Sequence, residues 1–384
     1  MVSANDRPAN WVDYARLAIL GAAVGIPAAL VAALFLAFVH ELQHWLWTDL
    51  PDALGGTSPQ WYLVVGLPVV GAAIVVIARA FLPGDGGSLP IKGLHHDPPL
   101  ISHGPGILLA AVATLGFGAV LGPEAPVIAL GAVVALAVTA FLRLPEQASR
   151  VIGTSGSFAA ISALFGGPIV AGVLMVEGGI GLGARLIPAL LPGFVAAAVG
   201  YVIFLGFGNW QGLHAPGLTV PNLELYNSSQ VRDLFIAVGV GIATALVLAA
   251  VRAFAIWLGG EGGRRLSMPA FLLGGGLTVG LIALLARGLG ANSQDVLFSG
   301  QASIPALVAE GSTGVLLVLV LAKAVAYGIS LVCGFRGGPI FPAVFLGIGV
   351  AMLPVVWFHA SPTLAVAIGT AAVTAAPAPN ARRN

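Results

Sequence analysis

Glu124 is the acidic residue with the most unusual surroundings in this sequence, because it lies between Pro123 and Pro126 at the start of an apolar run. An ionisable side chain inside an apolar span is costly, and such residues mark ion pathways and proton relays. At a helix N-terminus, where backbone N–H groups attract anions, a carboxylate can occupy an anion's own site and leave it when protonated. We therefore predict that Glu124 is a gate or a proton carrier. A carboxylate that only caps the helix over 126–142 is the alternative.

The segment around Glu124 occurs twice. GPEAPVIALG at 122–131 is echoed by GPIFPAVFLG at 338–347, and GDGGSLP at 84–90 is echoed by GQASIP at 300–305. Within a membrane, irregular backbone is tolerated only where it is buried in protein or lines a wet cavity. Helices broken at such loops aim their N-termini at anions. The pattern predicts two broken-helix loops in each half of the chain and favours anion passage.

The composition is that of a membrane protein. Hydrophobic residues make up 58% of the chain and charged residues 8%, whereas soluble proteins carry about 25% charged residues. Several apolar stretches, such as 106–121 and 168–182, are shorter than the ~20 residues that a perpendicular crossing needs, so we expect half-helices or steeply tilted helices there. The net charge of +1 gives no sign of the basic surface that binds nucleic acid. The single cysteine excludes a disulfide framework.

These patterns predict an all-α polytopic membrane protein of two inverted-repeat halves with broken and tilted helices, located in the cell membrane. We place a first membrane repeat at 13–207, a connecting segment at 208–230, a second membrane repeat at 231–376 and a disordered tail at 377–384. The repeats alone leave parallel symmetry open. We prefer inversion because inverted pairs commonly bring their discontinuous helices face to face near the midplane.

Over about residues 15–376 the chain resembles the CLC family of chloride channels and chloride/proton exchangers. GPEAP at 122–126 is similar to the family's gating-glutamate loop, usually Gly-Arg/Lys-Glu-Gly-Pro, and GPIFP at 338–342 is similar to its Gly-x-Phe-x-Pro loop. GDGGSLP at 84–90 resembles the Gly-Ser-Gly-x-Pro loop. FGGP at 165–168, leading to Glu177, resembles the Phe-Asn-Ala-Pro segment.

The resemblance implies that Glu124 is the external gate and that the backbone N–H groups of Ile340 and Phe341 coordinate a central anion together with the 84–90 loop. Gly122 and Ala125 belong to the gate loop and are expected to contribute to the anion site. In the 84–90 loop we favour Ser88 as the donor. A carboxylate aimed at an anion would repel it, so we expect Asp85 to turn toward solvent or a cation.

Several positions depart from the family's pattern. Pro123 and Pro339 have no N–H to donate, and Ile340 stands where the family usually has Phe. Proton exchangers generally carry an internal glutamate directly after the position of Glu177, where this chain has Gly178. We therefore expect channel-like transport of chloride or a similar small anion rather than strict proton coupling. A chloride/proton antiporter is the alternative, with Glu177 as a possible proton relay or a structural acid.

The resemblance also implies a homodimer in the lipid bilayer with one pore per subunit, no cofactor and no metal. The family's last helices, one of which bears an anion-binding Tyr, follow the second loop by a longer distance than this chain provides. Tyr327 precedes that loop, so we do not transfer the role to it. With a shortened C-terminus, a truncated pore and a nonfunctional fragment are two further alternatives.

Enzyme motifs offer weaker alternatives to a transporter. HELQH at 40–44 satisfies His-Glu-x-x-His, in which His40 and His44 could bind zinc with Glu41 as the base of an intramembrane protease. No third ligand is apparent, and we interpret the histidines as marking the water interface, with Trp45 and Trp47 as anchors.

GTSG at 153–156 is similar to the rhomboid Gly-x-Ser-Gly, but Ser155 lacks a histidine partner on another helix. We expect no enzyme. A neutral solute transporter is the stronger rival, yet it would not predict an acid facing anion-selective amides.

Overall fold

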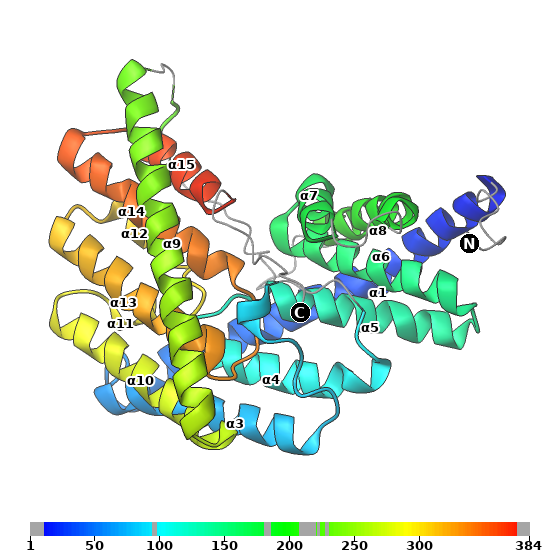
Figure 1. Ribbon diagram of the computed structural model, residues 1–384, viewed down its shortest axis with the longest axis horizontal. Coiled ribbons are helices and arrows are strands. Elements are labelled where there is room, and N and C mark those ends of the chain that lie inside the picture. The colour runs from blue at the N-terminus through cyan, green and yellow to red at the C-terminus, as the bar shows by residue number, and fades with distance from the viewer. Residues whose placement is uncertain are drawn as a thin grey trace. The chain divides into compact units, whose positions relative to one another are not determined.

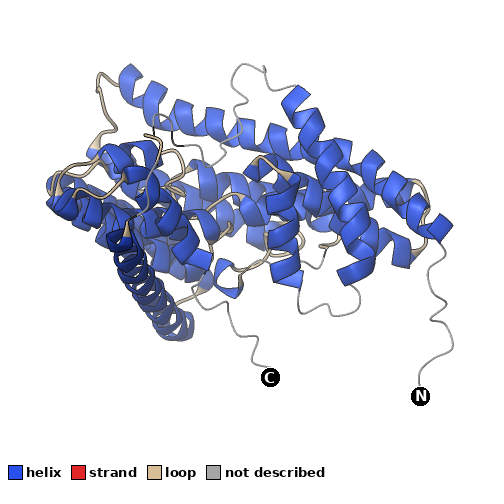
Figure 2. Ribbon diagram, turned by 90° about the horizontal axis from the view of Figure 1, so that it is seen from above, coloured by secondary structure: helices blue, strands red, loops and turns tan. Residues whose placement is uncertain are grey.

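The computed structural model describes residues 11–93, 98–179, 186–206, 220, 223–226 and 230–374. Helices account for most of these residues (Figures 1 and 2), and the described ranges contain one isolated β-bridge and no strand. Most of the predicted connecting segment and all of the predicted tail at 377–384 lie outside the described residues. The all-α expectation is confirmed.

The chain divides into two compact units, which do not follow the order of the sequence. The first unit comprises 1–38, 95–108 and 126–217, and the second comprises 39–94, 109–125 and 218–384. Three helices, α1 (Trp11–His44), α4 (Gly104–Gly116) and α5 (Glu124–Phe141), run from one unit into the other. The repeat boundaries at 13–207 and 231–376 stay a prediction.

In the first unit, small residues let helices pack closely. α6 (Glu146–Phe165) packs on α8 (Leu186–Gly206), and α7 (Pro168–Gly179) contacts both. A Cβ on Gly131 of α5 would lie 2.5 Å from the backbone oxygen of Gly156 on α6. Close backbone approach of this kind is how helices associate without a hydrophobic driving force in lipid.

The second unit holds the larger core. α3 (Trp61–Phe81) packs on α10 (Met268–Gly288), and α14 (Ile340–Phe358) packs on α15 (Pro362–Thr374). The long helix α9 (Val231–Arg265), light green in Figure 1, contacts α13 (Thr313–Val332), α14 and α15. Short turns complete the described elements: η1 (Trp45–Asp49), α2 (Leu50–Ala53), η2 (Pro90–Lys92), η3 (Ile101–His103), α11 (Ser293–Val296) and α12 (Ile304–Ala309).

Seven helices in the described residues are long and apolar enough to cross a membrane. They are Tyr14–Ala53, Trp61–Phe81, Glu124–Phe141, Val231–Arg265, Met268–Gly288, Thr313–Val332 and Ile340–Phe358. By contrast, α4 has 13 residues and α7 has 12, too few for a perpendicular crossing of a ~30 Å hydrocarbon layer. The expected short helices are therefore present.

Candidate functional site: an anion site at two helix N-termini

The two echoed loops meet inside the second unit. Gly122 N–H donates to Gly338 O over 2.8 Å, and Gly338 N–H donates to Gly122 O over 2.6 Å. This reciprocal exchange is the antiparallel bridge between the loops. Gly122 and Gly338 hold equivalent positions in the two motifs and face each other. The residues that follow each glycine are therefore brought close together.

Each loop opens a helix immediately after this bridge. α5 begins at Glu124 and α14 begins at Ile340. Pro126 and Pro342 occupy corresponding places in the first turns, where a missing N–H costs nothing because the first four N–H groups of a helix have no intrahelical partner. Two sets of N–H donors that lack intrahelical partners therefore begin within a few residues of the bridge.

The Glu124 side chain fills the space at the start of α14. It is fully buried, and its Oε1 accepts hydrogen bonds from Ile340 N–H at 2.5 Å and Phe341 N–H at 3.0 Å. Its Oε2 is buried and has no hydrogen-bond partner in the described part of the chain. The carboxylate sits where a helix N-terminus would hold a free anion, with half of its acceptor capacity unused.

Glycine is required on both sides of this carboxylate. A Cβ built on Gly122 or on Gly338 would overlap the carboxyl group of Glu124. The bridge glycines therefore leave room for the acid, which is the kind of close approach that glycine alone permits. Gly122 lines the site in this way, whereas the neighbouring Ala125 is half-buried and has no recorded hydrogen bond to the Glu124 side chain.

Tyr327 of α13 supports the same peptide group that binds Glu124. Its hydroxyl donates to Pro339 O over 2.8 Å, and the ring is 5% exposed. The Pro339 carbonyl and the Ile340 N–H belong to one amide, so Tyr327 and Glu124 bind its two ends. Hydrogen bonds in series polarise one another. Chain order did not reveal this residue, because it precedes the loop.

A cavity of about 230 Å³ adjoins this amide within the second unit. Tyr327, Pro339 and Ile340 form one wall, and Arg252 of α9 and Pro90 contribute to the others. The cavity gives space next to the amide that holds Glu124. Pro90 ends the 84–90 loop, so this loop does reach the neighbourhood of Ile340.

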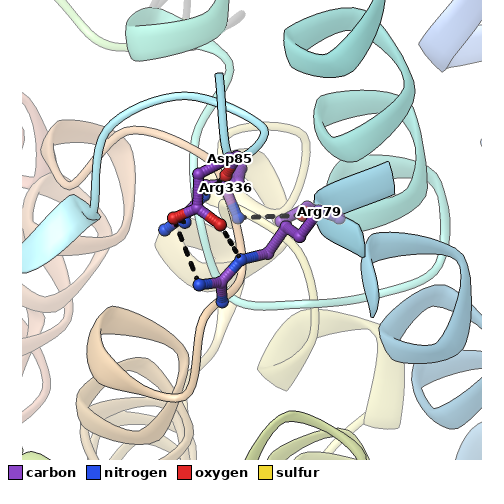
Figure 3. A network of polar contacts seen from close by, with 4 residues as sticks. Arg79, Asp85 and Arg336 are labelled. Atoms are coloured by element: carbon purple, nitrogen blue, oxygen red, sulfur yellow. Dashed lines mark hydrogen bonds and ion pairs between the residues drawn. The ribbon is translucent and has the colours of Figure 1, made fainter. Parts of the chain in front are cut away.

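Asp85 in that loop binds two arginines (Figure 3). Its Oδ1 accepts from Arg79 Nε at 2.7 Å, and its Oδ2 accepts from Arg336 Nη2 at 2.6 Å. Arg336 Nε donates to the backbone oxygen of Asp85 at 2.9 Å, and Arg336 N–H donates to Thr114 Oγ1 at 3.0 Å. Asp85 thus faces cations, as predicted. Its arginine partners were not foreseen.

A second buried base, Lys323, holds the segment just before the 300–305 echo of that loop. Lys323 of α13 is fully buried, and its Nζ donates to the backbone oxygens of Asp295, Val296 and Leu297 at 2.7, 3.2 and 3.0 Å. The ammonium also lies 4.3 Å from the ring centre of Phe345. All three donors of the ammonium are used, which fixes the 295–300 turn against α13 and α14.

Two predicted site residues are not joined to Glu124 by the described contacts. Ser88 is exposed and has no recorded hydrogen bond to Glu124, Ile340 or Phe341. Glu177 lies on α7 in the first unit, and its side chain is outside the described residues. The anion-binding role of Ser88 and the proton-relay role of Glu177 stay predictions.

The motifs of the alternative classes have ordinary surroundings. His40, Glu41 and His44 are exposed, and His44 Nδ1 lies 3.2 Å from an Asp49 oxygen. In the described part of the chain, no group of three or more His, Cys, Asp or Glu side chains is arranged to hold a metal. Ser155 is buried and donates to Val151 O of its own helix at 3.0 Å.

One interfacial prediction was wrong. Trp45 is 55% exposed, in keeping with an anchor, but Trp47 is 3% exposed. The Trp47 indole N–H donates to Gly116 O at 3.0 Å, at the C-terminal end of α4. Carbonyls at that end of a helix lack intrahelical donors, so Trp47 satisfies a buried helix end rather than a membrane surface.

Comparisons with known proteins point to one family. The family model described as voltage gated chloride channel matches residues 70–378. "Putative ion-transport protein YfeO" of Escherichia coli O1:K1 / APEC is 29% identical over 356 residues, covering 88% of this chain and 78% of that protein. The protein of the same name from Escherichia fergusonii is 28% identical with the same coverage.

Solved structures share the fold. A slow cyanobacterial Cl⁻/H⁺ antiporter aligns with a TM-score of 0.73 at 16% identity, covering 94% of this chain and 85% of that one. A CLC-type fluoride/proton antiporter aligns with a TM-score of 0.68 at 21% identity, covering 95% and 87%. The chain therefore belongs to the voltage gated chloride channel family, CLC, whose members are multi-pass membrane proteins that transport small anions.

Proposed function

We propose that this protein passes chloride or a similar small anion across the membrane, and that Glu124 gates the passage by competing with the anion for one site. The observation that carries the proposal is the pair of hydrogen bonds from the Ile340 and Phe341 amides to Glu124 Oε1. A halide is an acceptor for the same N–H groups, and the positive end of α14 favours either negative charge.

The gate would open when Glu124 becomes neutral or swings away. Hydrogen bonds to an ionised acceptor are roughly twice as strong as those to a neutral one, so protonation weakens the hold of both amides on Oε1. Oε2 adds no hydrogen bond that would keep the side chain in place. The freed amides then replace part of the anion's hydration shell, which is how backbone groups select ions in filters.

The route to the site on one side is supported by the cavity next to Ile340. Pro339 and Ile340 both line it, and Ile340 N–H is one of the two donors that bind the Glu124 carboxylate. Arg252 contributes the positive charge among the lining residues. A cationic lining raises the local anion concentration.

Channel-like passage is the reading we favour over proton exchange. Gly178 stands directly after Glu177, where exchangers of the resembled family generally carry an acid. One residue of the proton-transfer pathway is therefore missing. The chloride/proton antiporter remains the second candidate. It is favoured by two solved structures with this fold, which are of a Cl⁻/H⁺ and a fluoride/proton antiporter.

The experiment is radiolabelled chloride efflux from proteoliposomes with proton movement recorded at the same time. We expect chloride efflux without stoichiometric proton movement, rising as the pH falls because Glu124 is neutralised. Glu124→Gln removes the charge and should give efflux that no longer responds to pH. Glu41→Gln, an exposed acid on α1, is the matched control and should behave as the unaltered protein.

Two results would count against the proposal. Identical pH responses in Glu124→Gln and Glu41→Gln would remove Glu124 as the gate. A fixed ratio of protons to chloride in the unaltered protein would replace the channel by the antiporter.

We also propose a homodimer with one pore per subunit, on the strength of family membership. Light scattering on the purified protein in detergent gives the protein mass directly, and a monomer at all concentrations would contradict it.

A further inference from the structure

The Asp85 cluster carries an unbalanced charge. Arg79 and Arg336 both form ion pairs with Asp85, and no other acid is recorded as a partner of either guanidinium in the described residues. Two cations and one anion leave one positive charge. Arg336 is nearly enclosed, with 2% of its side chain exposed, and an uncompensated charge in such a place is costly.

The cluster also has an unused donor. Arg336 Nε and Nη2 donate to Asp85, but Arg336 Nη1 is buried and has no hydrogen-bond partner among the residues that the structure describes. A guanidinium carries five N–H donors in a fixed plane, so the free edge of Arg336 is ready for one more acceptor. Buried polar atoms are rarely left unpaired, and a bound ion or water is one explanation for an exception.

The backbone holds these side chains in place. Asp85 and the glycines on either side of it have positive φ, so this turn is tightly folded. A Cβ on Gly86 would lie 3.5 Å from Arg336 Cγ, and a Cβ on Gly334 would lie 2.5 Å from Arg79 Nη1. The turns around Asp85 and Gly334 thus close on the two guanidiniums from separate parts of the chain.

The Asp85 carboxylate is open to solvent, because 59% of its side chain is exposed. Guanidinium groups pair with any small acceptor anion, and Asp85 is an anion supplied by the chain itself. The cluster is also close to the Glu124 site. Arg336 and Ile340 are four positions apart in the chain, and a chain of that length spans at most ~14 Å.

We infer that Arg79 and Arg336 form a second binding subsite for a small inorganic anion, in which the Asp85 carboxylate holds the anion's place. The anion would take the position of the Asp85 carboxylate between the two guanidiniums and reach the free Nη1 edge of Arg336. The enclosure of Nη1 favours a halide or an ion of similar size over a lipid headgroup. The inference rests on the proposed function only for the choice of small anions as ligands.

The test is bromide titration by calorimetry on the full-length protein purified in detergent without added lipid. Asp85→Ala removes the competing carboxylate and should bind bromide at least ~10-fold more tightly than the unaltered protein, because a charge-assisted hydrogen bond is gained for each freed donor. Asp52→Ala, an exposed acid on α2, is the control. Adding Arg79→Gln to Asp85→Ala should abolish the gain.

A crystal of Asp85→Ala soaked in bromide should show its anomalous peak against Arg336. If Asp85→Ala is not monodisperse, Asp85→Asn keeps the size of the side chain and replaces it in both experiments. Bromide affinity equal to that of Asp52→Ala, with a lowered melting temperature, would show a cluster that only joins two turns and would overturn the inference.

The Glu124 gate and the subsite at Arg79 and Arg336 can be refuted independently of each other. Bromide at the Ile340 amides depends on Glu124 and not on Asp85, so Glu124→Gln tests the first site alone. A gain in Asp85→Ala without a gain in Glu124→Gln would reject the gate and keep the subsite, and the reverse result would reject the subsite and keep the gate.

Discussion

Replacing Tyr327 by Phe should weaken anion binding, although the hydrogen bond of Tyr327 goes to Pro339 O rather than to Glu124. The hydroxyl donates to Pro339 O over 2.8 Å, and the other end of that amide is the Ile340 N–H that binds Glu124. Without the hydroxyl, the carbonyl loses its donor and the peptide loses both polarisation and a fixed orientation. A buried hydrogen bond contributes about 1 kcal/mol net.

About 1 kcal/mol corresponds to roughly a fivefold change in an equilibrium constant. We therefore expect Glu124→Gln/Tyr327→Phe to bind bromide about fivefold more weakly than Glu124→Gln, measured by calorimetry in a background where the carboxylate no longer competes. Tyr62→Phe is the matched control, because Tyr62 is 45% exposed on α3. Equal bromide affinities for the Tyr327 and Tyr62 variants would refute the role assigned to the shared amide.

Three further predictions concern other parts of the chain. Lys323→Met leaves three carbonyls without their buried donor and should destabilise the protein by roughly 2–4 kcal/mol, seen as a lower melting temperature. Lys92→Met, at an exposed lysine of η2, should leave the melting temperature unchanged. Glu177→Gln should leave both chloride efflux and its pH response unchanged if transport is channel-like, and a loss of proton movement in this variant would instead identify an exchanger. Gly131→Ala should lower the melting temperature because its Cβ would lie 2.5 Å from Gly156 O, and an unchanged melting temperature would contradict the close packing of α5 on α6.

The sequence predicted the meeting of the echoed loops because two copies of one motif in a repeat protein tend to face each other. Glu124 was also accessible to sequence reasoning, since an acid at the start of an apolar helix has few other uses. The reciprocal bridge between Gly122 and Gly338 then follows from the same repetition.

The partners of that site were not accessible. Asp85 and Arg336 are separated by 251 positions, and nothing in their local sequence pairs them. Tyr327 was set aside because it precedes the loop, yet α13 brings its hydroxyl back to Pro339. Trp47 was assigned to the membrane surface by residue type, whereas tertiary packing buries it on the end of α4. Each case depends on a contact between segments distant in the chain.

The central claim is that the Glu124 carboxylate and a small anion compete for the amides of Ile340 and Phe341. Anomalous diffraction from crystals grown in bromide measures this directly, in the unaltered protein and in Glu124→Gln. We expect a bromide peak within hydrogen-bond distance of both N–H groups in Glu124→Gln and a much weaker one in the unaltered protein. A well-ordered Glu124→Gln structure with no bromide at these amides would contradict the account.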